Sequence, residues 1–334
     1  MDTQRLPRRD VALTEVGFGA AQGGDLYRPT THEEFARAVE TAWDGGVRYF
    51  DTAPHYGLGL SERRLGALLR DRPRGELVLS TKVGRLLVPS PSTAHERDLD
   101  HGGMFDVPAD VRRVWDFTAD GVRRSLEESL GRLGLDRVDV VYLHDPDEAG
   151  LLDVAIAEAI PALAALRDEG VIGAIGAGMN ASAPLARVVR EGDVDVVMCA
   201  GRYTLLDPSA ADDLLPLAAE RGVGVVVAGV YNSGLLAHDR PPADATYDYA
   251  QAPRELLMRA HRIADVCEAH GVTLPAAALA FVRGHPAVVS TVVGLRTAEQ
   301  VTQALDRAAT AVPAALWRDL RSAGLLRADV PAPA

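Results

Sequence analysis

Four side chains able to move a proton stand near the ends of three consecutive predicted strands. Asp51, Lys82 and His144 each end an apolar run, and Tyr56 follows five residues after Asp51. A phenol with its ordinary pKa of about 10 is a poor acid or base at neutral pH. A neighbouring ammonium lowers that pKa and a carboxylate holds the ammonium, while an imidazole can orient a substrate oxygen or relay its proton. Together these groups could polarise a carbonyl as hydride arrives, or remove an alcohol proton as hydride leaves.

Lys82 is the only lysine among the 35 basic residues of the chain. A composition this rich in arginine uses arginine wherever a surface cation is enough, so the exception needs a local reason. A compact ammonium can approach a phenol closely, and its pKa shifts on burial, whereas a planar guanidinium stays charged and prefers bidentate partners. The lone lysine therefore points to a role in tuning Tyr56.

The elements that must position these groups are short apolar strands alternating with amphipathic helical segments. Each strand is apolar on both faces and bounded by Gly, Asp or Pro, which is typical of a buried parallel sheet. The strands are expected at 15–19, 47–50, 77–81, 138–143, 172–176, 194–198, 224–228 and 288–293. Helical patterns lie between them at 31–44, 62–70, 118–133, 153–169, 182–190 and 212–221.

Strands alternating with helices imply right-handed parallel crossovers, which two α/β architectures use. A doubly wound sheet would usually carry a GxGxxG turn after an early strand, and none occurs. Eight strands instead fit a single-domain (β/α)8 TIM barrel spanning residues 1–334, whose strand ends gather the four residues at one mouth. Long loops follow strands 3 and 7, at 85–116 and 239–253, and loops of this length are usually lids or binding loops.

Composition narrows the class of protein. With 334 residues, 47% hydrophobic residues and 25% charged residues, the chain matches ordinary globular proteins rather than disordered ones. A net charge of −12 without a basic tail argues against nucleic acid as a partner. The two cysteines could form one disulfide, although so few thiols suit a reducing compartment better. Neither a signal peptide nor a membrane span is expected, so the predicted location is the cytoplasm.

The spacing Asp51-x4-Tyr56, with Lys82 and His144 at later strand ends, resembles the catalytic tetrad of aldo-keto reductases. The resemblance runs from the glycine-rich segment 17–19 to the segment 294–296. It implies an NAD(P)-dependent oxidoreductase on a barrel, with the cofactor lying across the later strand ends. In that family pattern Tyr56 is the acid and base, Lys82 and Asp51 tune it, and His144 contacts the substrate and its proton. No metal is expected, since the strand-end His and Asp residues already belong to the tetrad.

The resemblance also implies a set of cofactor-binding residues in the second half of the chain. Asn180 matches the family's Ser-Asn element, although Met179 replaces the serine, and Tyr203 matches the aromatic residue that stacks on nicotinamide. Cys199 and the alanine after it occupy the place of a frequent glutamine. The segment after the seventh strand resembles the pyrophosphate loop, where small residues and backbone N–H donors suit phosphate. Its candidates are Gly229, Tyr231, Asn232, Ser233, Gly234 and Leu235.

The segment after the eighth strand bears on the choice of cofactor. Gly294, Arg296 and Gln300 are its candidate cofactor residues. Many NADPH-using relatives place a lysine and an arginine here for the 2′-phosphate, and only Arg296 is available. NADP is favoured over NAD if Arg296 closes on the phosphate. NAD follows if Glu299 or another acceptor binds the 2′-hydroxyl, and a solvated arginine at a helix start is an equal alternative.

A narrower resemblance concerns the substrate. Segments 115–126, 141–147 and 201–206 are similar to an aldose-oxidising branch that includes L-fucose (D-threo-aldose) 1-dehydrogenases and pyridoxal 4-dehydrogenases. This implies oxidation of an anomeric hydroxyl to a lactone. Candidate substrate contacts are His55, Trp115 and Tyr231, with His95 and His101 in the loop after strand 3.

Other functions remain open from the sequence. A general aldehyde or ketone reductase, or a pyridoxal dehydrogenase, would share the fold. A lysine at a barrel strand end is also how Schiff-base aldolases work, although that hypothesis leaves Tyr56 unused. A nucleotide-sensing regulatory barrel is a third class. The sequence does not indicate an oligomeric state.

Overall fold

A closed barrel of eight parallel strands forms the centre of the molecule, and the computed structural model describes residues 1–333. Around the barrel the strands neighbour one another in the order β10-β11-β14-β3-β4-β5-β8-β9, and β9 pairs with β10 to close it. Their bounds are β3 (Val16–Gly19), β4 (Tyr49–Asp51), β5 (Val78–Val83), β8 (Val138–His144), β9 (Ile172–Met179), β10 (Val196–Ala200), β11 (Gly224–Ala228) and β14 (Val288–Gly294). The predicted TIM barrel and all eight predicted strands are confirmed.

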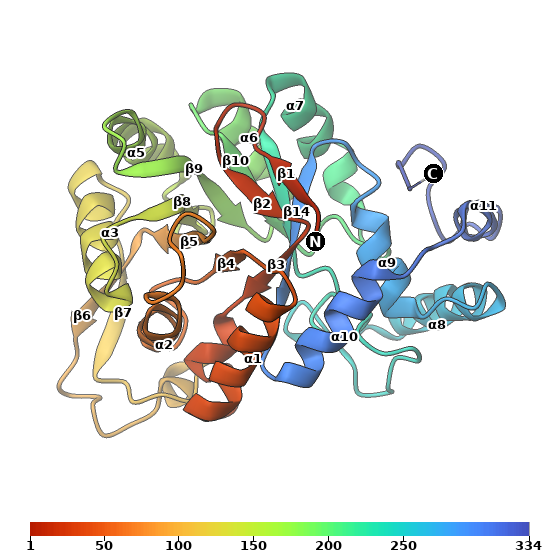
Figure 1. Ribbon diagram of the computed structural model, residues 1–334, viewed down its shortest axis with the longest axis horizontal. Coiled ribbons are helices and arrows are strands. Elements are labelled where there is room, and N and C mark those ends of the chain that lie inside the picture. Colours follow the sequence, from red (N-terminus) through yellow and green to blue (C-terminus); the bar gives the residue numbers. More distant parts are fainter. Residues whose placement is uncertain (334) are drawn as a thin grey trace.

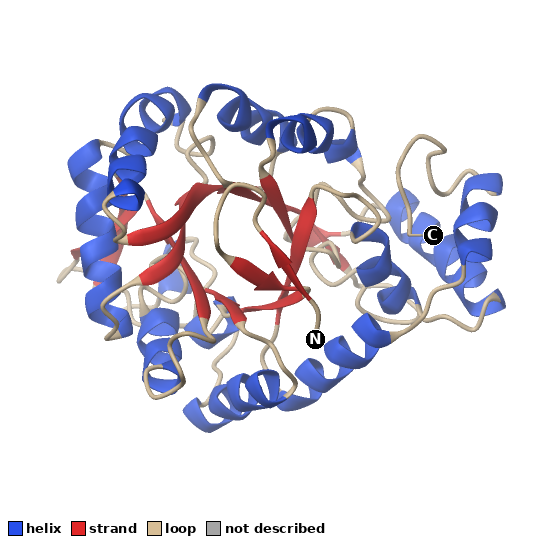
Figure 2. Cartoon of the chain, turned by 45° about the horizontal axis from the view of Figure 1, so that its top comes forward, coloured by secondary structure: helices blue, strands red, loops and turns tan. Residues whose placement is uncertain are grey.

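Helices surround the strands on the outside (Figures 1 and 2). The predicted helical patterns correspond to α1 (His32–Asp44), α2 (Leu60–Leu69), α3 (Ala119–Leu133), α4 (Leu152–Val154) with α5 (Ile160–Asp168), α6 (Ser182–Glu191) and α7 (Leu214–Arg221). A π-helical turn, Ala155–Ala159, joins α4 to α5. The C-terminal part adds α8 (Arg254–Ala269), α9 (Leu274–Val282), α10 (Ala298–Ala309) and α11 (Ala314–Ser322). Thr31 and Thr118 cap α1 and α3 by accepting hydrogen bonds from Glu34 N and Gly121 N.

The inner face of the barrel changes from apolar to polar along each of three strands. Side chains alternate across a strand, so every second residue of β4, β5 and β8 faces inward. Tyr49 is followed on this face by Asp51, and Tyr142 by His144. On β5 the corresponding residue at the mouth is Lys82. Strand periodicity therefore places the three ionisable groups in one layer at the carboxyl end of the barrel.

The two long segments after β5 and β11 contain their own short strands instead of being irregular throughout. The first holds an antiparallel hairpin of β6 (Arg85–Pro89) and β7 (Val111–Trp115), with a 3-10 turn, η2 (Asp98–His101), between them. The second holds β12 (Thr246–Tyr247) and β13 (Ala250–Gln251). Period-2 apolar patterning is weak in both segments, because many of their residues are exposed.

The amino end of the barrel is closed by a hairpin that the sequence pattern did not indicate. It consists of β1 (Thr3–Arg5) and β2 (Ala12–Thr14). In Figure 1 this hairpin lies over the barrel strands. Leu6 and Leu13 from this segment belong to the same buried cluster as the inward-facing residues of the barrel. The hairpin therefore excludes water from the barrel interior at the end opposite to the ionisable layer.

Two further features of the chain concern its cysteines and its apolar helices. Cys199 and Cys267 are both buried and free, so they do not form the possible disulfide. Among residues 1–333 no single helix is long and apolar enough to cross a membrane. α8 and α9 reach that length and composition only as a pair, which is bent by 95° at its junction.

Candidate active site

Lys82 lies at the centre of the predicted catalytic residues. Its Nζ donates hydrogen bonds to Asp51 Oδ2 at 2.6 Å, to the Thr52 carbonyl at 3.1 Å and to the Tyr56 phenol oxygen at 3.0 Å. The side chains of Lys82 and Asp51 are each only 3% exposed. An ammonium has three donors, and each has a separate acceptor here. A planar guanidinium has its donors in a fixed fork and does not match three acceptors around one point.

A hydrogen-bond chain beneath the ammonium fixes the carboxylate of Asp51. Ser80, the register partner of Asp51 on β5, donates from Oγ to Asp51 Oδ1 at 2.7 Å. The same hydroxyl lies 3.2 Å from Tyr49 Oη, which is 3.1 Å from Tyr142 Oη. Both oxygens of Asp51 are therefore occupied, one by a hydroxyl and one by the ammonium, and the carboxylate holds Lys82 against Tyr56.

Tyr56 is partly exposed at the mouth, and its phenol oxygen accepts from Lys82. Burial raises the pKa of Tyr56 above its ordinary value, Lys82 opposes this shift, and Asp51 adds to it. The sequence argument considered only the effect of the ammonium, so the net direction differs from that expectation because burial is the larger cause. The phenol is protonated at neutral pH, and its own hydrogen can still be donated to a substrate oxygen.

His144 is buried next to Tyr56 and is neutral. Burial first, and then the cations of Arg85 and Lys82, hold the pKa of His144 well below its usual range. Its ring centroid lies 5.8 Å from that of Tyr56 at an interplanar angle of 87°. A neutral imidazole keeps one donor and one acceptor nitrogen, so His144 can hydrogen-bond a substrate oxygen without carrying charge into the site.

Two predicted substrate residues form the wall beside the tetrad. The His55 ring lies edge-on to His144, with centroids 5.5 Å apart, and edge-on to Phe105 at 5.2 Å. Trp115 on β7 is 36% exposed, and the guanidinium carbon of Arg85 lies 4.2 Å from the centroid of its ring. The β6–β7 hairpin thus brings a tryptophan and an arginine to the mouth.

Arg85, Asp145 and Glu148 were not among the residues expected from the sequence to act at the site. Arg85 forms an ion pair with Asp145 and another with Glu148, the latter at 3.2 Å. Asp145 Oδ2 is 3.4 Å from His144 Nε2. The available signal was position alone, since Asp145 directly follows His144 and Arg85 comes three residues after Lys82.

The loops after the later strands supply backbone turns and uncharged polar groups. After β11 the backbone has positive φ at Gly229 (61°), Asn232 (45°), Ser233 (57°) and Gly234 (99°). Asn232 is buried and donates from Nδ2 to the Gly201 carbonyl at 3.2 Å, while its Oδ1 has no partner within residues 1–333. Leu235 is fully buried beneath this turn.

A second narrow place lies between the ends of β3 and β14. A Cβ on Gly294 would come within 2.6 Å of the Gln22 amide, so only glycine fits without displacing that side chain. Oε1 of Gln22 is buried and has no partner among the described residues. Asn180, after β9, is partly buried, and its Nδ2 donates to Glu148 Oε1 at 3.4 Å.

Comparison with known proteins identifies the family. The Aldo/keto reductase family model matches residues 15–324. The chain is 51% identical over 316 residues to a D-threo-aldose 1-dehydrogenase from Pseudomonas sp, covering 95% of each chain. It is 37% identical to a pyridoxal 4-dehydrogenase from Microbacterium luteolum, covering 97% of this chain and 98% of that protein. The fold matches a glycerol dehydrogenase structure from Gluconobacter oxydans, with TM-score 0.77, 22% identity and coverage of 100% and 97%.

The chain belongs to the aldo/keto reductase family. The family resemblance read from the four residues is thereby confirmed, and the protein is an oxidoreductase of a family that uses NAD(P)H. Within residues 1–333 no group of three or more His, Cys, Asp or Glu side chains is arranged to hold a metal ion.

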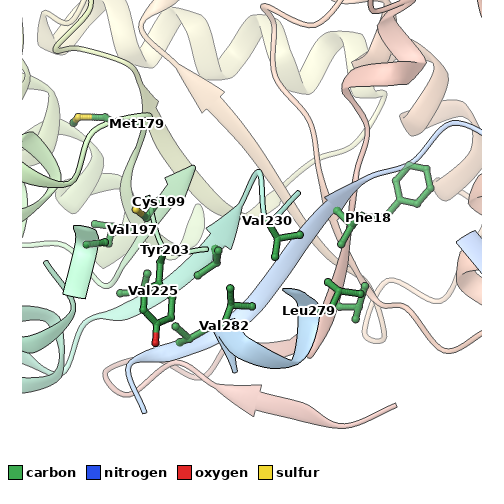
Figure 3. Packing of buried hydrophobic residues seen from close by; sticks show 14 of the residues in the cluster. Phe18, Met179, Val197, Cys199, Tyr203, Val225, Val230, Leu279 and Val282 are labelled. Atoms are coloured by element: carbon green, nitrogen blue, oxygen red, sulfur yellow. The ribbon is translucent and has the colours of Figure 1, made fainter. Parts of the chain in front are cut away.

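Tyr203 does not lie with the other candidate cofactor residues of this reductase. It is fully buried in the hydrophobic layer between strands and helices, with its ring centroid 5.1 Å from Phe281. Figure 3 shows it among buried residues that include Val225 and Val282. Its hydroxyl donates to the Pro331 carbonyl at 3.4 Å. A ring with no exposed surface in this layer cannot stack on a nicotinamide at the mouth, so the structure does not support that expectation.

Arg296 is neither a solvated residue nor an open cation. It is 7% exposed, and its guanidinium donates to the carbonyls of Leu26 at 2.6 Å and Arg28 at 3.0 Å and to Thr30 Oγ1. Its backbone N–H donates to Gln300 Oε1 at 2.8 Å. These bonds tie the segment after β14 to the segment before α1, which corrects the hypothesis of a solvated arginine, while a contact of Arg296 with a 2′-phosphate stays a prediction.

The remaining candidate residues in the loops contact other protein groups. Tyr231 packs against the outer hydrophobic layer, and Arg307 on α10 lies 6.0 Å from its ring centroid. His95 lies 3.5 Å from Glu96 on the surface of the segment after β6, and His101 pairs with the same carboxylate. Among the predicted substrate contacts, only His55 and Trp115 contact Arg85 beside the tetrad.

Proposed function

We propose that this reductase is an NAD(P)-dependent aldose 1-dehydrogenase that oxidises the anomeric hydroxyl of a small sugar to a lactone in the cytoplasm. The observation that carries the proposal is the placement of Lys82 Nζ between Asp51 and the Tyr56 phenol, beside neutral His144. The relative at 51% identity, a D-threo-aldose 1-dehydrogenase, supports an aldose as the substrate.

Tyr56 and Lys82 handle the proton in this reaction. In oxidation the hydroxyl proton leaves to the Tyr56 phenolate, while the hydrogen on C1 leaves with its electron pair. Lys82 favours the phenolate by donating to its oxygen, and Asp51 keeps the ammonium at hydrogen-bond distance. His144, held neutral, orients the reacting oxygen. In reduction Tyr56 gives the same proton back to the carbonyl oxygen.

The residues of the later strand ends fit a nicotinamide dinucleotide. The turn of positive-φ residues after β11 and the Gly294 cradle allow close approach of a ligand to the backbone, and Asn232 Oδ1 and Gln22 Oε1 are buried acceptors without protein partners. Gly229, Asn232, Ser233 and Gly234 would hold the pyrophosphate, and Asn180 the carboxamide. When bound, an oxidised nicotinamide would accept the hydride from C1, and a reduced one would return it to the carbonyl carbon.

Both NAD and NADP are proposed as cofactors, with no dedicated clamp for the 2′-phosphate. The bonds of Arg296 to Leu26, Arg28 and Thr30 support this proposal, because the cation expected to distinguish the two cofactors already has partners. The chain offers no second lysine for this role.

The test is a substrate screen with the purified enzyme and both cofactors, followed by absorbance at 340 nm. L-fucose, D-arabinose, L-galactose and pyridoxal are the substrates. Lactone formation from an aldose, with kcat/KM above that for pyridoxal, is expected. Turnover of pyridoxal alone would assign the activity of the 37% relative instead. Borohydride trapping of a sugar on Lys82 without reduced cofactor would replace the proposal with a Schiff-base mechanism.

A further inference from the structure

Asp145 occupies a constrained place beside the reacting groups. It directly follows His144 and is one of the few residues other than glycine in the left-handed region, with φ at 49°. Its N–H donates to the Gly178 carbonyl at 3.0 Å, and the residue is 8% exposed. Asp tolerates this conformation better than most residues, yet such positions persist mainly where the surroundings hold them, often at functional sites. The turn thus places the carboxylate of Asp145 at the carboxyl end of β8.

Arg85 fixes that carboxylate from another element. It follows Gly84, where a φ of 102° turns the chain from β5 into β6. A Cβ on Gly84 would lie 2.1 Å from the Phe117 ring, so this turn requires glycine. The Arg85 side chain is 9% exposed, and its guanidinium pairs with Asp145 and lies 3.4 Å from His55 Nδ1. The guanidinium carbon of Arg85 also lies over the Trp115 ring, 4.2 Å from its centroid. Such an arginine has little freedom to move, so Asp145 is pre-positioned.

The carboxylate has one oxygen left for a ligand. Arg85 and His144 both contact Oδ2, and no donor to Oδ1 is found among residues 1–333. Oδ1 keeps some surface open to solvent, so a ligand hydroxyl can approach it. Burial, with a smaller effect of Glu148 and Asp147, raises the pKa of Asp145 to about 7 despite Arg85. A carboxylate in such surroundings gains from hydroxyl donors.

We propose that Asp145, held by Arg85, is the residue that recognises the hydroxyl next to the reacting carbon of the substrate. The proposal rests on the aldose oxidation proposed above. The substrate oxygen that Tyr56 and His144 contact is O1, and the neighbouring sugar oxygen, O2, lies about one hydrogen-bond length from it. Asp145 Oδ2 is 3.4 Å from His144 Nε2, so a substrate held by His144 lies beside this carboxylate, and Oδ1 would accept the O2 hydrogen. Asp145 is thus a specificity residue for α-hydroxy substrates.

The experiment compares sugars that differ only at C2. D-arabinose and 2-deoxy-D-ribose have the same configuration at C3 and C4. The two sugars differ in intrinsic reactivity, but this difference is the same for wild type and variant, so it cancels when the ratio of their kcat/KM values is compared between the two enzymes. In Asp145→Asn we expect kcat/KM for D-arabinose to fall by about 10- to 100-fold, the value of a hydrogen bond to a charged group, while 2-deoxy-D-ribose changes little. The kcat/KM for D-arabinose divided by that for 2-deoxy-D-ribose should therefore fall by the same factor.

Two variants guard against a structural explanation. Asp145→Gly removes the carboxylate and suits the positive φ, so it should fold and show the same decrease of this ratio. Asp147→Asn alters a carboxylate in the same turn that pairs with neither Arg85 nor His144 in the described structure, and it should leave the ratio unchanged. An equal loss for both sugars in Asp145→Asn would overturn the proposal and make Asp145 a support for His144.

A second substrate pair keeps this result separate from the proposed function. The reduction of lactaldehyde and of propionaldehyde also compares the presence and absence of a hydroxyl beside the reacting carbon, and it does not need sugar oxidation. A wild-type enzyme that oxidises no aldose but reduces lactaldehyde would refute aldose oxidation alone. The same variants would then decide the role of Asp145 from this pair, with an unchanged ratio rejecting it.

Discussion

The two ends of the barrel each bury an ionic cluster, and they use different cations. At the amino end Asp195 is fully buried and accepts from Arg9 Nε at 2.7 Å, from Arg167 Nη1 at 3.1 Å and from the Ile175 N–H at 3.1 Å. At the carboxyl end Asp51 accepts from Ser80 and from Lys82. Both carboxylates have cationic and neutral donors, but only the second cluster includes a phenol.

The difference explains why one lysine stands among 34 arginines. Arg9, between β1 and β2, joins the N-terminal hairpin to Asp195, and Arg167 of α5 binds the same carboxylate and the Asp193 carbonyl. A buried pair of this kind holds the structure in place. Lys82 instead directs three donors to three separate acceptors, and one of them, Tyr56, keeps a hydrogen that can be transferred. Arginine suits the structural cluster, and lysine the reactive one.

The largest expected effect is on Tyr56. Tyr56→Phe removes the phenol oxygen to which Lys82 donates, so kcat should fall by about 10²- to 10⁴-fold while the affinity for the cofactor is retained. Steady-state kinetics and a cofactor titration by fluorescence measure both. Tyr203→Phe is the matched control, since it removes a hydroxyl that donates to the Pro331 carbonyl away from the Lys82 cluster and should leave kcat near wild type. Full turnover in Tyr56→Phe would remove the assigned role.

Lys82→Arg should cost slightly less but still about 10²-fold in kcat/KM, because a guanidinium cannot match the acceptors Asp51, Thr52 and Tyr56 together. Lys82→Met adds a test by pH. Lys82 lowers the pKa of Tyr56, so its removal should raise that pKa further. Less phenolate is then present at neutral pH, and the oxidation rate profile should move to higher pH. A near-wild-type Lys82→Arg enzyme would show that the two clusters do not depend on the choice of cation.

Asp195→Asn should affect stability instead of chemistry. It leaves Arg9 and Arg167 without their carboxylate, so the free energy of unfolding should fall by about 3 kcal/mol. Denaturant titration measures the change, and kcat/KM of the folded variant should match that of the wild type. A loss of kcat/KM at unchanged stability would contradict the division between the two ends.

Arg296→Ala should have the smallest effect. Releasing the Leu26 and Arg28 carbonyls loosens the segment before α1, so the Kd values for NAD and NADP should both rise by about 10-fold. The two Kd values come from parallel titrations. A selective loss of NADP binding would instead show that Arg296 turns to a 2′-phosphate when the cofactor binds.

The eight strands and the layer of Asp51, Lys82 and His144 followed from the sequence because both depend on local periodicity. Apolar runs bounded by Gly, Asp or Pro mark buried parallel strands, and parallel strands must end at one mouth. Alternation along β4, β5 and β8 then decides which side chains face inward, whatever the loops do. Tyr56 could be placed by its short distance in sequence from Asp51.

Tertiary structure alone decided what happens beyond the strand ends. Tyr203 and Arg296 both follow strands closely, yet one entered the outer hydrophobic layer and the other bound the backbone near Leu26. Arg85 and Asp145 are 60 residues apart and closely follow β5 and β8, which pair in the barrel, but only the turns at Gly84 and Asp145 decide that their side chains meet. Loop dihedrals and long-range packing set these directions, and neither has a period that the sequence displays. The lone lysine was therefore visible in the composition, while the partners of the arginines appeared only in the folded chain.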